Sequence, residues 1–290
     1  MHVQSFFEPV TGTVSYVGAD TVAGQAAVID PVLDFDARSG RLSTASSDVL
    51  IDYVRQQGWQ VPWILETHAH ADHLSGAQHV RKTLGGQVAI GQHIRQVQQM
   101  FRSIFHFERS FLPDCSQFDV LLADGQELAI GSLTLRALHV PGHTPADMAY
   151  IATDDEKTVV FVGDTLFAPD VGTARCDFPG GDAKTLYHSI KKLLALPEDT
   201  IIYLCHDYPS KGRQHCPTTT VAAQKLGNIH VKDGINEAEF VQMRERRDAT
   251  LDMPRLIIPS VQVNIDAGHF PEPEDNGTRY LKVPINVLGQ

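Results

Sequence analysis

The sequence predicts an α/β protein in which layered sheets and helices bring metal-binding residues together at the ends of strands. Three observations support this. Apolar runs with strand character recur along the chain, and stretches with helical spacing lie between several of them. Polar residues that can bind a metal follow four of these strands directly. The 290 residues are enough to bury a sizeable core as one or two domains.

The first half of the chain alternates between strand and helix patterns. The predicted elements, in order, are strands at 13–17 and 25–29, a helix from 47 to 54, a strand at 61–65, a helix at 75–84, a strand at 87–90 and a helix at 93–106. Ser47 and Asp48 are expected to cap the first helix, after a loop rich in turn-forming residues. The stretch from Arg109 to Asp119 is expected to be irregular.

The second half continues the same alternation. Its predicted elements are strands at 133–140, 148–152 and 158–162, a helix at 182–194, a strand at 200–204 and a helix at 237–250. A tail rich in Pro, Gly and Asn follows. We expect one domain over residues 1–290, with a C-terminal extension from about residue 210 that is too short to fold alone.

Charge and composition exclude several classes of protein. The chain carries 24 Lys and Arg against 35 Asp and Glu, a formal charge of -11, which argues against nucleic acid or an anionic membrane surface as the main partner. No apolar stretch approaches the roughly 18 residues of a membrane span, and the N-terminus lacks a secretory signal pattern. Four scattered cysteines do not form a disulfide framework. A cytoplasmic enzyme is therefore expected.

Four predicted strands lead into residues that commonly bind metals. These residues are His68, His70, Asp72 and His73, then His143, then Asp164, and finally His206 and Asp207. Open α/β sheets place ligand sites at strand ends, so these side chains are expected to converge on a cation. Three imidazoles and a carboxylate within six residues would be costly to desolvate without one. The other nine histidines lack such a context and are interpreted as structural or solvated.

These motifs, in this order, resemble those of the metallo-β-lactamase superfamily. The matching segments are His68-Ala-His70-Ala-Asp72-His73, Pro-Gly-His143-Thr, Gly-Asp164-Thr-Leu-Phe and Cys-His206-Asp207-Tyr. The resemblance covers about residues 10–210 and implies an αββα sandwich of two mixed sheets flanked by helices, with the metal site at one edge of the sheets. Because this superfamily hosts both hydrolases and oxidoreductases, the fold alone does not decide the function.

Within the superfamily, the chain is similar to the persulfide dioxygenases, which are sulfur dioxygenases related to glyoxalase II. The finer match lies in residues 29–36, in Gly163-Asp164-Thr-Leu-Phe followed by the block 172–178, in His206-Asp207-Tyr208 and in residues 254–264. The resemblance implies oxidation of glutathione persulfide by O2 and water to sulfite and glutathione, a reaction of sulfur metabolism and hydrogen sulfide detoxification.

The same resemblance implies a mononuclear Fe(II) site, one per chain, held by His68, His143 and Asp164. Two imidazoles and one carboxylate form a facial triad that leaves positions on iron for dioxygen and substrate. The remaining motif residues would orient the ligands and bind waters. They are His70, Asp72, His73 and His206.

Glutathione carries two carboxylates, so cationic and hydroxyl groups are expected near the site despite the overall acidity. Arg175 and Tyr208 are the candidates for binding the substrate, since both follow ligand-bearing strands. Arg175 could instead form a salt bridge with Asp177 or another carboxylate, and Tyr208 could pack in the core. Weaker options are Lys211, Arg213, Arg244, Arg246 and Arg247. Cys176 could be an inert packed thiol or an oxidation-sensitive one.

The main alternative is a glyoxalase II-like thioesterase with two metals. In that enzyme, two metal ions flank a bridging hydroxide. The residues that would help to hold these ions are His70, Asp72, His73 and His206. Since every such residue is present, the ligand inventory does not distinguish the two enzymes. A metal-binding protein without turnover ranks last. The expected partners are glutathione persulfide and O2, with a homodimer left open. The segment 101–118 is expected either to form part of the substrate entrance or to be a surface loop.

Overall fold

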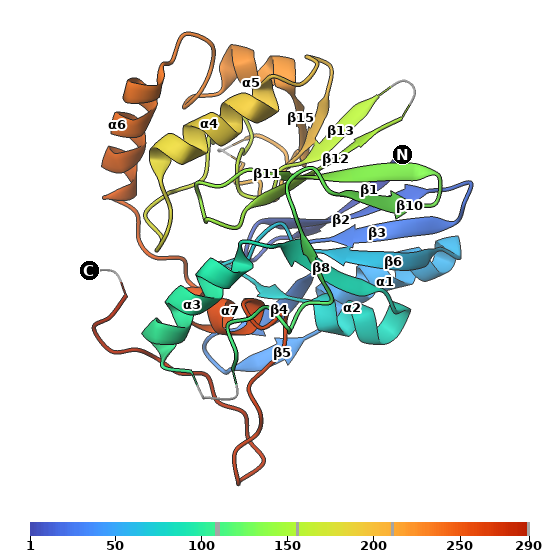
Figure 1. The fold of residues 1–290 in the computed structure, drawn as a ribbon, viewed down its shortest axis with the longest axis vertical. Helices are drawn as coiled ribbons and strands as arrows, with labels where there is room; N and C mark the ends of the chain where they lie inside the picture. Colours follow the sequence, from blue (N-terminus) through green and yellow to red (C-terminus); the bar gives the residue numbers. More distant parts are fainter. Residues whose placement is uncertain (108–110, 155–156, 210–211, 289–290) are drawn as a thin grey trace.

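The computed structural model describes the whole chain except residues 108–110, 155–156, 210–211 and 289–290. Two six-stranded sheets form its centre (Figure 1). The first contains β1 (His2–Glu8), β2 (Thr13–Asp20), β3 (Gln25–Ile29), β6 (Gln60–Leu65), β8 (Gln87–Gly91) and β9 (Val120–Leu122), in this order across the sheet. The second contains β10 (Glu127–Ile130), β11 (Leu133–His139), β12 (Met148–Thr153), β13 (Thr158–Phe161), β14 (Ile201–Tyr203) and β15 (Thr218–Thr220), also in order.

Both sheets mix parallel and antiparallel pairs. In the first, β1, β2 and β3 pair antiparallel, whereas β3, β6, β8 and β9 pair parallel. In the second, only β13 and β14 pair parallel among the described strands. A small third sheet joins β5 (Arg41–Ser43), β4 (Val32–Asp36) and β7 (Leu74–Ser75). The prediction of two mixed sheets is confirmed.

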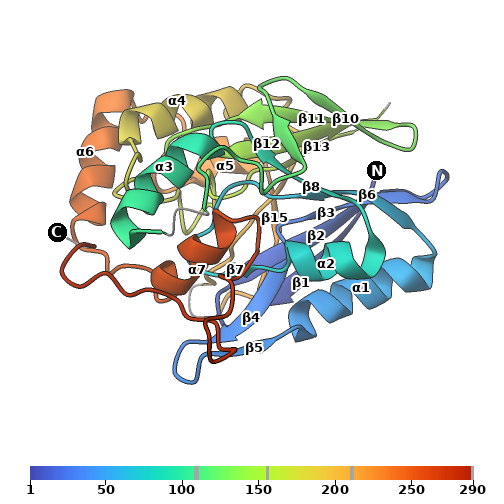
Figure 2. The ribbon, with the colours of Figure 1, turned by 60° about the horizontal axis from the view of Figure 1, so that its bottom comes forward.

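Three buried clusters define four layers. One fills the space between the two large sheets, with Tyr16 and Ile29 meeting Tyr150 and Phe161. A second joins the outer face of the first sheet to α1 (Ala45–Gln57), α2 (Ala77–Leu84), α3 (Ile94–Phe105) and α7 (Ile257–Asn264). A third joins the outer face of the second sheet to α4 (Ala183–Leu194), α5 (Val221–Gly227) and α6 (Glu237–Asp248). Figure 1 shows these helix groups on opposite sides of the sheets, and Figure 2 shows α1 and α2 on the side away from α4, so the expected αββα order of layers is confirmed.

One predicted helix start is wrong. We expected Ser47 and Asp48 to cap the first helix, but α1 begins at Ala45 with Thr44 at the cap position. Ser47 lies buried inside the helix, and its hydroxyl donates a hydrogen bond to the backbone carbonyl of Val32. Tertiary packing against β4 therefore overrides the local capping preference of this serine.

Several elements of the structure were not predicted from the sequence patterns, among them β9, β10, β15 and α5. The strand β1 precedes the first predicted strand, and the hairpin β4–β5 lies within the predicted turn-rich loop. The helix α7 lies within the tail rich in Pro, Gly and Asn, where no element was predicted; Pro259 falls in its first turn, where a missing backbone N–H costs nothing. Part of the predicted irregular stretch, residues 108–110, lies outside the described residues. In the described parts of the chain, no helix is long and apolar enough to cross a membrane.

The buried side chain of His230 makes the fold sensitive to acid. Its Nδ1 accepts a hydrogen bond from the backbone N–H of Thr173 at 3.0 Å. Burial, together with the charges of Arg244 and Arg247, lowers the pKa of His230 to about 4. The folded state therefore holds this imidazole neutral, whereas the unfolded chain protonates it near pH 6.5. Its contribution to stability is present above pH 6.5 and is lost as the pH falls toward 4.

We expect the variant His230→Gln, which has no titrating group at this position, to lose less stability on acidification than the wild type. The difference in the change of unfolding free energy between pH 7 and pH 4.5 should be on the order of 2 kcal/mol, because the pKa of the imidazole falls from about 6.5 in the unfolded chain to about 4 in the folded one. Urea unfolding at several pH values measures it. Parallel pH profiles for the two proteins would contradict the assignment.

Candidate metal centre

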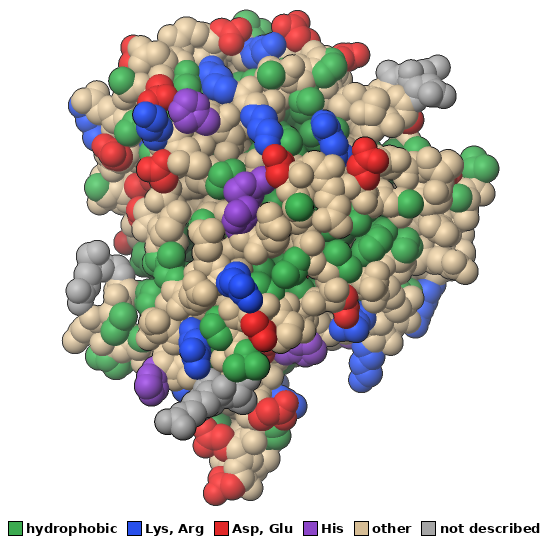
Figure 3. Space-filling view, viewed as in Figure 1, with side chains coloured by type: hydrophobic (Ala, Val, Ile, Leu, Met, Phe, Trp, Pro, Cys, Tyr) green, Lys and Arg blue, Asp and Glu red, His purple; other side chains and the backbone are tan. Residues whose placement is uncertain are grey.

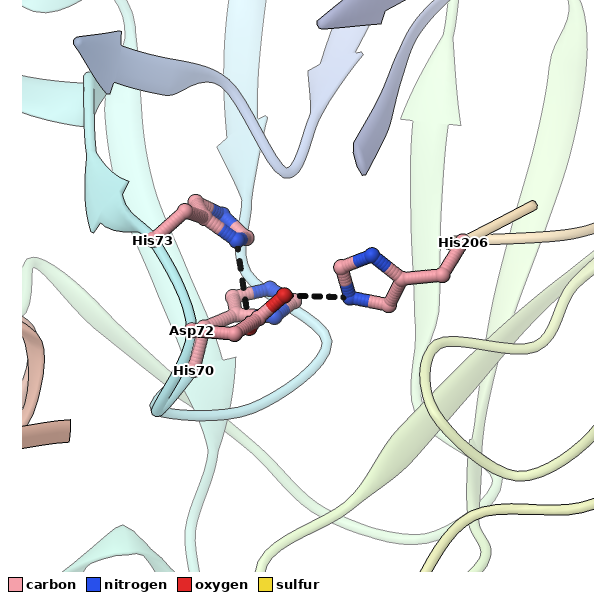
Figure 4. Close-up of side chains that lie close together, drawn as sticks. All are labelled: His70, Asp72, His73 and His206. Carbon is pink, nitrogen blue, oxygen red and sulfur yellow. Dashed lines mark ion pairs between the residues drawn. The ribbon is translucent and has the colours of Figure 1, made fainter. Parts of the chain in front are cut away.

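The predicted ligands meet where four strands end. The motif at 68–73 follows β6, His143 follows β11, Asp164 follows β13 and His206 follows β14. Since β6 belongs to the first large sheet and the other three strands to the second, the site bridges the junction of the two sheets. Figure 4 shows the motif loop and His206 approaching each other from the two sides.

One group of donors consists of His68, His143 and Asp164, all buried. One ligand atom from each lies within 4.8 Å of the others. Asp164 Oδ2 lies 3.8 Å from His68 Nε2 and 3.7 Å from His143 Nε2. These separations exceed hydrogen-bond distance and leave room for an ion among the three atoms, at the metal–ligand distances of about 2.0–2.2 Å found in proteins.

A second group consists of His70, Asp72, His73 and His206, again within 4.8 Å of one another (Figure 4). The Asp72 carboxylate lies 3.1 Å from His206 Nε2 and 3.4 Å from His73 Nδ1. His206 Nε2 also lies 3.2 Å from Asp164 Oδ1, so Asp164 links the two groups. The structure thus brings together every metal-binding residue that the sequence motifs predicted, with the exception of Asp207.

The chemistry of these donors fits a metal ion. Among the described residues, several buried atoms of the site have no partner that meets hydrogen-bond geometry. They are His68 Nε2, His70 Nδ1 and Nε2, Asp72 Oδ2, His73 Nε2, Asp164 Oδ1 and His206 Nε2. Unpaired buried polar atoms are costly, and native proteins rarely keep so many in one place. A cation bound among them would satisfy the imidazoles and carboxylates together.

Backbone and side-chain contacts orient the first group. His143 Nδ1 lies 2.7 Å from the carbonyl oxygen of Arg175; because a carbonyl only accepts, Nδ1 carries the proton and Nε2 is left free for a metal. The residue before His68 is fixed as well. Thr67 donates from its backbone N–H and its hydroxyl to the two carboxylate oxygens of Asp30, at 2.7 and 2.8 Å. Asp30 has a φ of 48°, an uncommon conformation for a non-glycine residue.

Asn264, at the last position of α7, fixes the motif loop from the opposite end of the chain. Its side-chain amide donates to the carbonyl oxygens of His70 and His73, both at 2.8 Å. Its side-chain oxygen accepts from the backbone N–H of Ser75 at 2.8 Å. Asn264 ends the segment 254–264 that carries part of the family resemblance, but the sequence assigned it no role at the site.

Burial and neighbouring charges separate the pKa values of the site histidines. Burial, together with the charge of His70, holds the pKa of His68 well below its usual range, which favours the neutral form that ligates metals. Burial alone would also lower the pKa of His206, but the carboxylates of Asp164 and Asp72 raise it to about 9. Without an ion, protonated imidazoles balance part of the negative charge here, so an ion that ligates them displaces protons.

A cavity of about 370 Å³ opens onto Asp72, His143 and Asp164. Both candidates for binding the substrate line it. The guanidinium of Arg175 donates twice to Asp177, at 2.6 Å each, so the salt bridge that the sequence left open is present. Tyr208 is not a core residue: 48% of it is exposed, and its ring stacks on that of His206 with an interplanar angle of 7°.

The remaining residues singled out in the sequence have other surroundings. Asp207 binds the guanidinium of Arg213 and the backbone N–H of Cys216, and belongs to neither donor group. Cys176 is buried, and this burial raises the pKa of its thiol, which favours the packed over the reactive interpretation. No described residue of the segment 101–118 lines this cavity or the adjoining one, so these residues do not form the entrance to either.

Comparisons with known proteins agree with this geometry. A model of the metallo-beta-lactamase superfamily matches residues 9–206. A probable metallo-hydrolase of Burkholderia pseudomallei is 53% identical, with 99% of this chain and 100% of that protein covered. Glyoxylase B2 of Dictyostelium discoideum is 46% identical, with 99% and 98% covered. Persulfide dioxygenase ETHE1 of Homo sapiens is 30% identical, with 71% and 68% covered.

Among solved structures, ETHE1 from Myxococcus xanthus superposes with a TM-score of 0.73. It is 28% identical in sequence, and the match covers 93% of this chain and 100% of that one. The likeness therefore extends beyond the metal-binding strands into the C-terminal part of the chain.

Proposed function

Since the chain belongs to the metallo-beta-lactamase superfamily, we propose that it is a persulfide dioxygenase, which oxidises glutathione persulfide with O2 and water to sulfite and glutathione. The observation that carries the proposal is the donor group His68, His143 and Asp164, two members of which line the cavity. Two imidazoles and one carboxylate are the ligand set of non-haem Fe(II) oxygenases. The likeness to ETHE1 proteins in sequence and in structure supports the same function.

The site would hold one Fe(II) per chain through His68, His143 and Asp164. When bound, Fe(II) supplies open coordination positions at which dioxygen and the substrate sulfur can meet. The outer sulfur of the persulfide gives up four electrons, and O2 accepts them. The S–S bond breaks; two oxygen atoms of sulfite come from O2 and the third from water, with release of glutathione and two protons. The reaction needs no nicotinamide reductant.

The chain's own residues position the reactants. The carbonyl of Arg175 holds the imidazole of His143 in one tautomer, with Nε2 free. The rings of Phe167 and Phe178 and the side chain of Leu256 give the cavity an apolar wall beside the ligands. Such a wall excludes bulk water and strengthens the electrostatic interactions inside the site.

A dinuclear thioesterase of the glyoxalase II type is the second candidate. It is favoured by the donor group His70, Asp72, His73 and His206, which offers ligand atoms for a second ion. The names of the relatives from Burkholderia pseudomallei and Dictyostelium discoideum support this alternative. Two ions flanking a bridging hydroxide would attack a thioester carbonyl rather than activate dioxygen.

Metal content and oxygen uptake separate the two candidates. In protein purified without added metals we expect about one iron per chain. We also expect stoichiometric uptake of O2 with glutathione persulfide, with sulfite as product, and no hydrolysis of S-D-lactoylglutathione. Elemental analysis, an oxygen electrode and a thioester assay give these three results. Two zinc ions per chain, thioester hydrolysis and no oxygen uptake would overturn the dioxygenase assignment.

A further inference from the structure

The cavity beside the metal-binding residues is basic, although the protein as a whole is acidic. Its lining includes four arginines: Arg175, Arg244, Arg247 and Arg255. Apart from the ligands Asp72 and Asp164, no described acidic residue lines it. On the face seen in Figure 3, by contrast, Lys and Arg side chains lie scattered among Asp and Glu. The lining of this cavity thus contains more arginines than acidic residues, in a chain whose net charge is -11.

Two of the four arginines are already engaged. Arg175 is paired with Asp177, and its Nη1 also donates to the carbonyl oxygen of Asp252 at 2.6 Å. Arg244 is 1% exposed, and it donates from Nε and Nη2 to Asp248 Oδ1 at 2.9 and 2.6 Å. These guanidiniums hold the wall of the cavity together, and the carboxylates nearest to them neutralise their charges.

The other two have no such partners. Within the described part of the chain, the side chain of neither Arg247 nor Arg255 forms a hydrogen bond or an ion pair, and both residues are exposed at the cavity. Arg247 lies in the last turn of α6, where the helix dipole favours a cation. Arg255 directly precedes Leu256, the N-cap of α7, where the dipole disfavours one. The dipole of α7 therefore gives no reason for a positive charge at Arg255.

Arg255 also lies between two cavities. A second cavity of about 510 Å³, bounded by the β4–β5 hairpin and by His73, shares Val10, Thr11, Phe35, Arg255 and Leu256 with the first. The second cavity is also lined by Glu8, Asp34 and Asp36, which would repel an anionic group. A carboxylate that pairs with Arg255 is therefore expected on the side of the first cavity, where the only acidic residues in the described lining are Asp72 and Asp164.

We propose that Arg247 and Arg255 bind the two carboxylates of the thiol that carries the substrate sulfur, and so determine specificity for a tripeptide thiol over smaller ones. This inference rests on the proposed function in taking glutathione as that thiol. A guanidinium offers a planar pair of N–H donors that matches a carboxylate, and those of Arg247 and Arg255 are free to do so. They are specificity-determining residues and do not contact the reacting sulfur.

Binding of reduced glutathione to the metal-loaded protein tests the proposal without turnover. The variants are Arg247→Gln and Arg255→Gln, with Arg246→Gln as the matched control. Arg246 is exposed on the same helix as Arg247 but lines neither cavity. We expect each cavity variant to raise the dissociation constant of glutathione about tenfold, the typical effect of one lost charge-assisted pair, and the control to leave it unchanged.

Glutathione monoethyl ester, in which the glycine carboxylate is blocked, identifies which arginine binds that group. The wild type should bind the ester about tenfold more weakly than glutathione. In the variant that lacks the arginine facing the glycine carboxylate, this difference should disappear, while in the other variant it should remain. Circular dichroism and metal content of each variant show whether the fold and the site are intact.

The outcomes distinguish this inference from the proposed function. If both cavity variants bind glutathione as tightly as the control does, or if the wild type does not bind glutathione, the carboxylate sites are misassigned. If binding depends on Arg247 and Arg255 but glutathione persulfide causes no oxygen uptake, the dioxygenase proposal fails and the assignment of the two arginines stands.

Discussion

Replacing Asp164 with alanine is expected to abolish metal retention. Asp164 is the carboxylate shared by the two donor groups: its Oδ2 faces His68 and His143, and its Oδ1 lies 3.2 Å from His206. Without it, the first group keeps two imidazoles and no anionic ligand. Loss of a residue that only orients a metal ligand lowers metal affinity by up to about 100-fold. Because Asp164 would itself be a ligand, we expect its loss to lower the affinity by more than this. Elemental analysis after gel filtration measures the loss.

A matched acidic variant controls for the change of charge. Asp177→Asn removes a carboxylate that lies close to the cavity but pairs with Arg175 and belongs to neither donor group. It should retain the full metal content. Full metal content in Asp164→Ala would show that the ion is held elsewhere, and metal loss in both variants would point to general instability rather than to a lost ligand.

The variant Gly142→Ala is expected to lower the free energy of unfolding by about 3–5 kcal/mol. Gly142 has a φ of 143°, and a Cβ there would lie 2.3 Å from Leu186 Cα and 2.4 Å from Leu186 N. These are backbone atoms of α4, which cannot move aside as the end of a flexible side chain can. Because Gly142 directly precedes His143, the same displacement would move a metal ligand. Guanidinium unfolding measures the effect.

Gly24→Ala separates steric conflict from backbone strain. Gly24 also has a positive φ, of 65°, but a Cβ added there meets nothing within 4 Å. In this variant the free energy of unfolding should fall by only about 1 kcal/mol, the cost of a positive φ for a residue other than glycine. Equal losses in the two variants would mean that the contact with α4 does not determine the stability at Gly142.

The sequence predicted the strands that carry the ligands because their signals are local. The apolar run 61–65 ends in a motif dense with imidazoles, and no other part of the fold is needed to interpret it. The helix α7 gave no comparable signal. It is apolar on most sides and packs in the buried cluster beneath the first sheet, so it lacks the polar stripe by which a surface helix is identified.

Within the site, too, the sequence predicted local features and missed contacts between distant parts of the chain. Arg175 could be placed near the ligands from its motif, but its pairing with Asp177 depends on side-chain rotamers that spacing does not determine. Asn264 contacts the motif loop across 191 residues of sequence. Arg255 and Asn264 both lie in the segment 254–264 that carries part of the resemblance, but the resemblance assigned neither of them a role. The motifs do not decide between one ion and two, since they contain the residues of both donor groups.

The position of the donor groups across the junction of the sheets has a consequence for how the molecule opens. His68 extends from the first large sheet, whereas His143 and Asp164 extend from the second, so an ion held by all three acts as a cross-link between the two halves of the sandwich. Binding of the ion stabilises the folded state by an amount that grows with the logarithm of the ratio of its concentration to its dissociation constant. Separation of the halves and release of the ion are then one event.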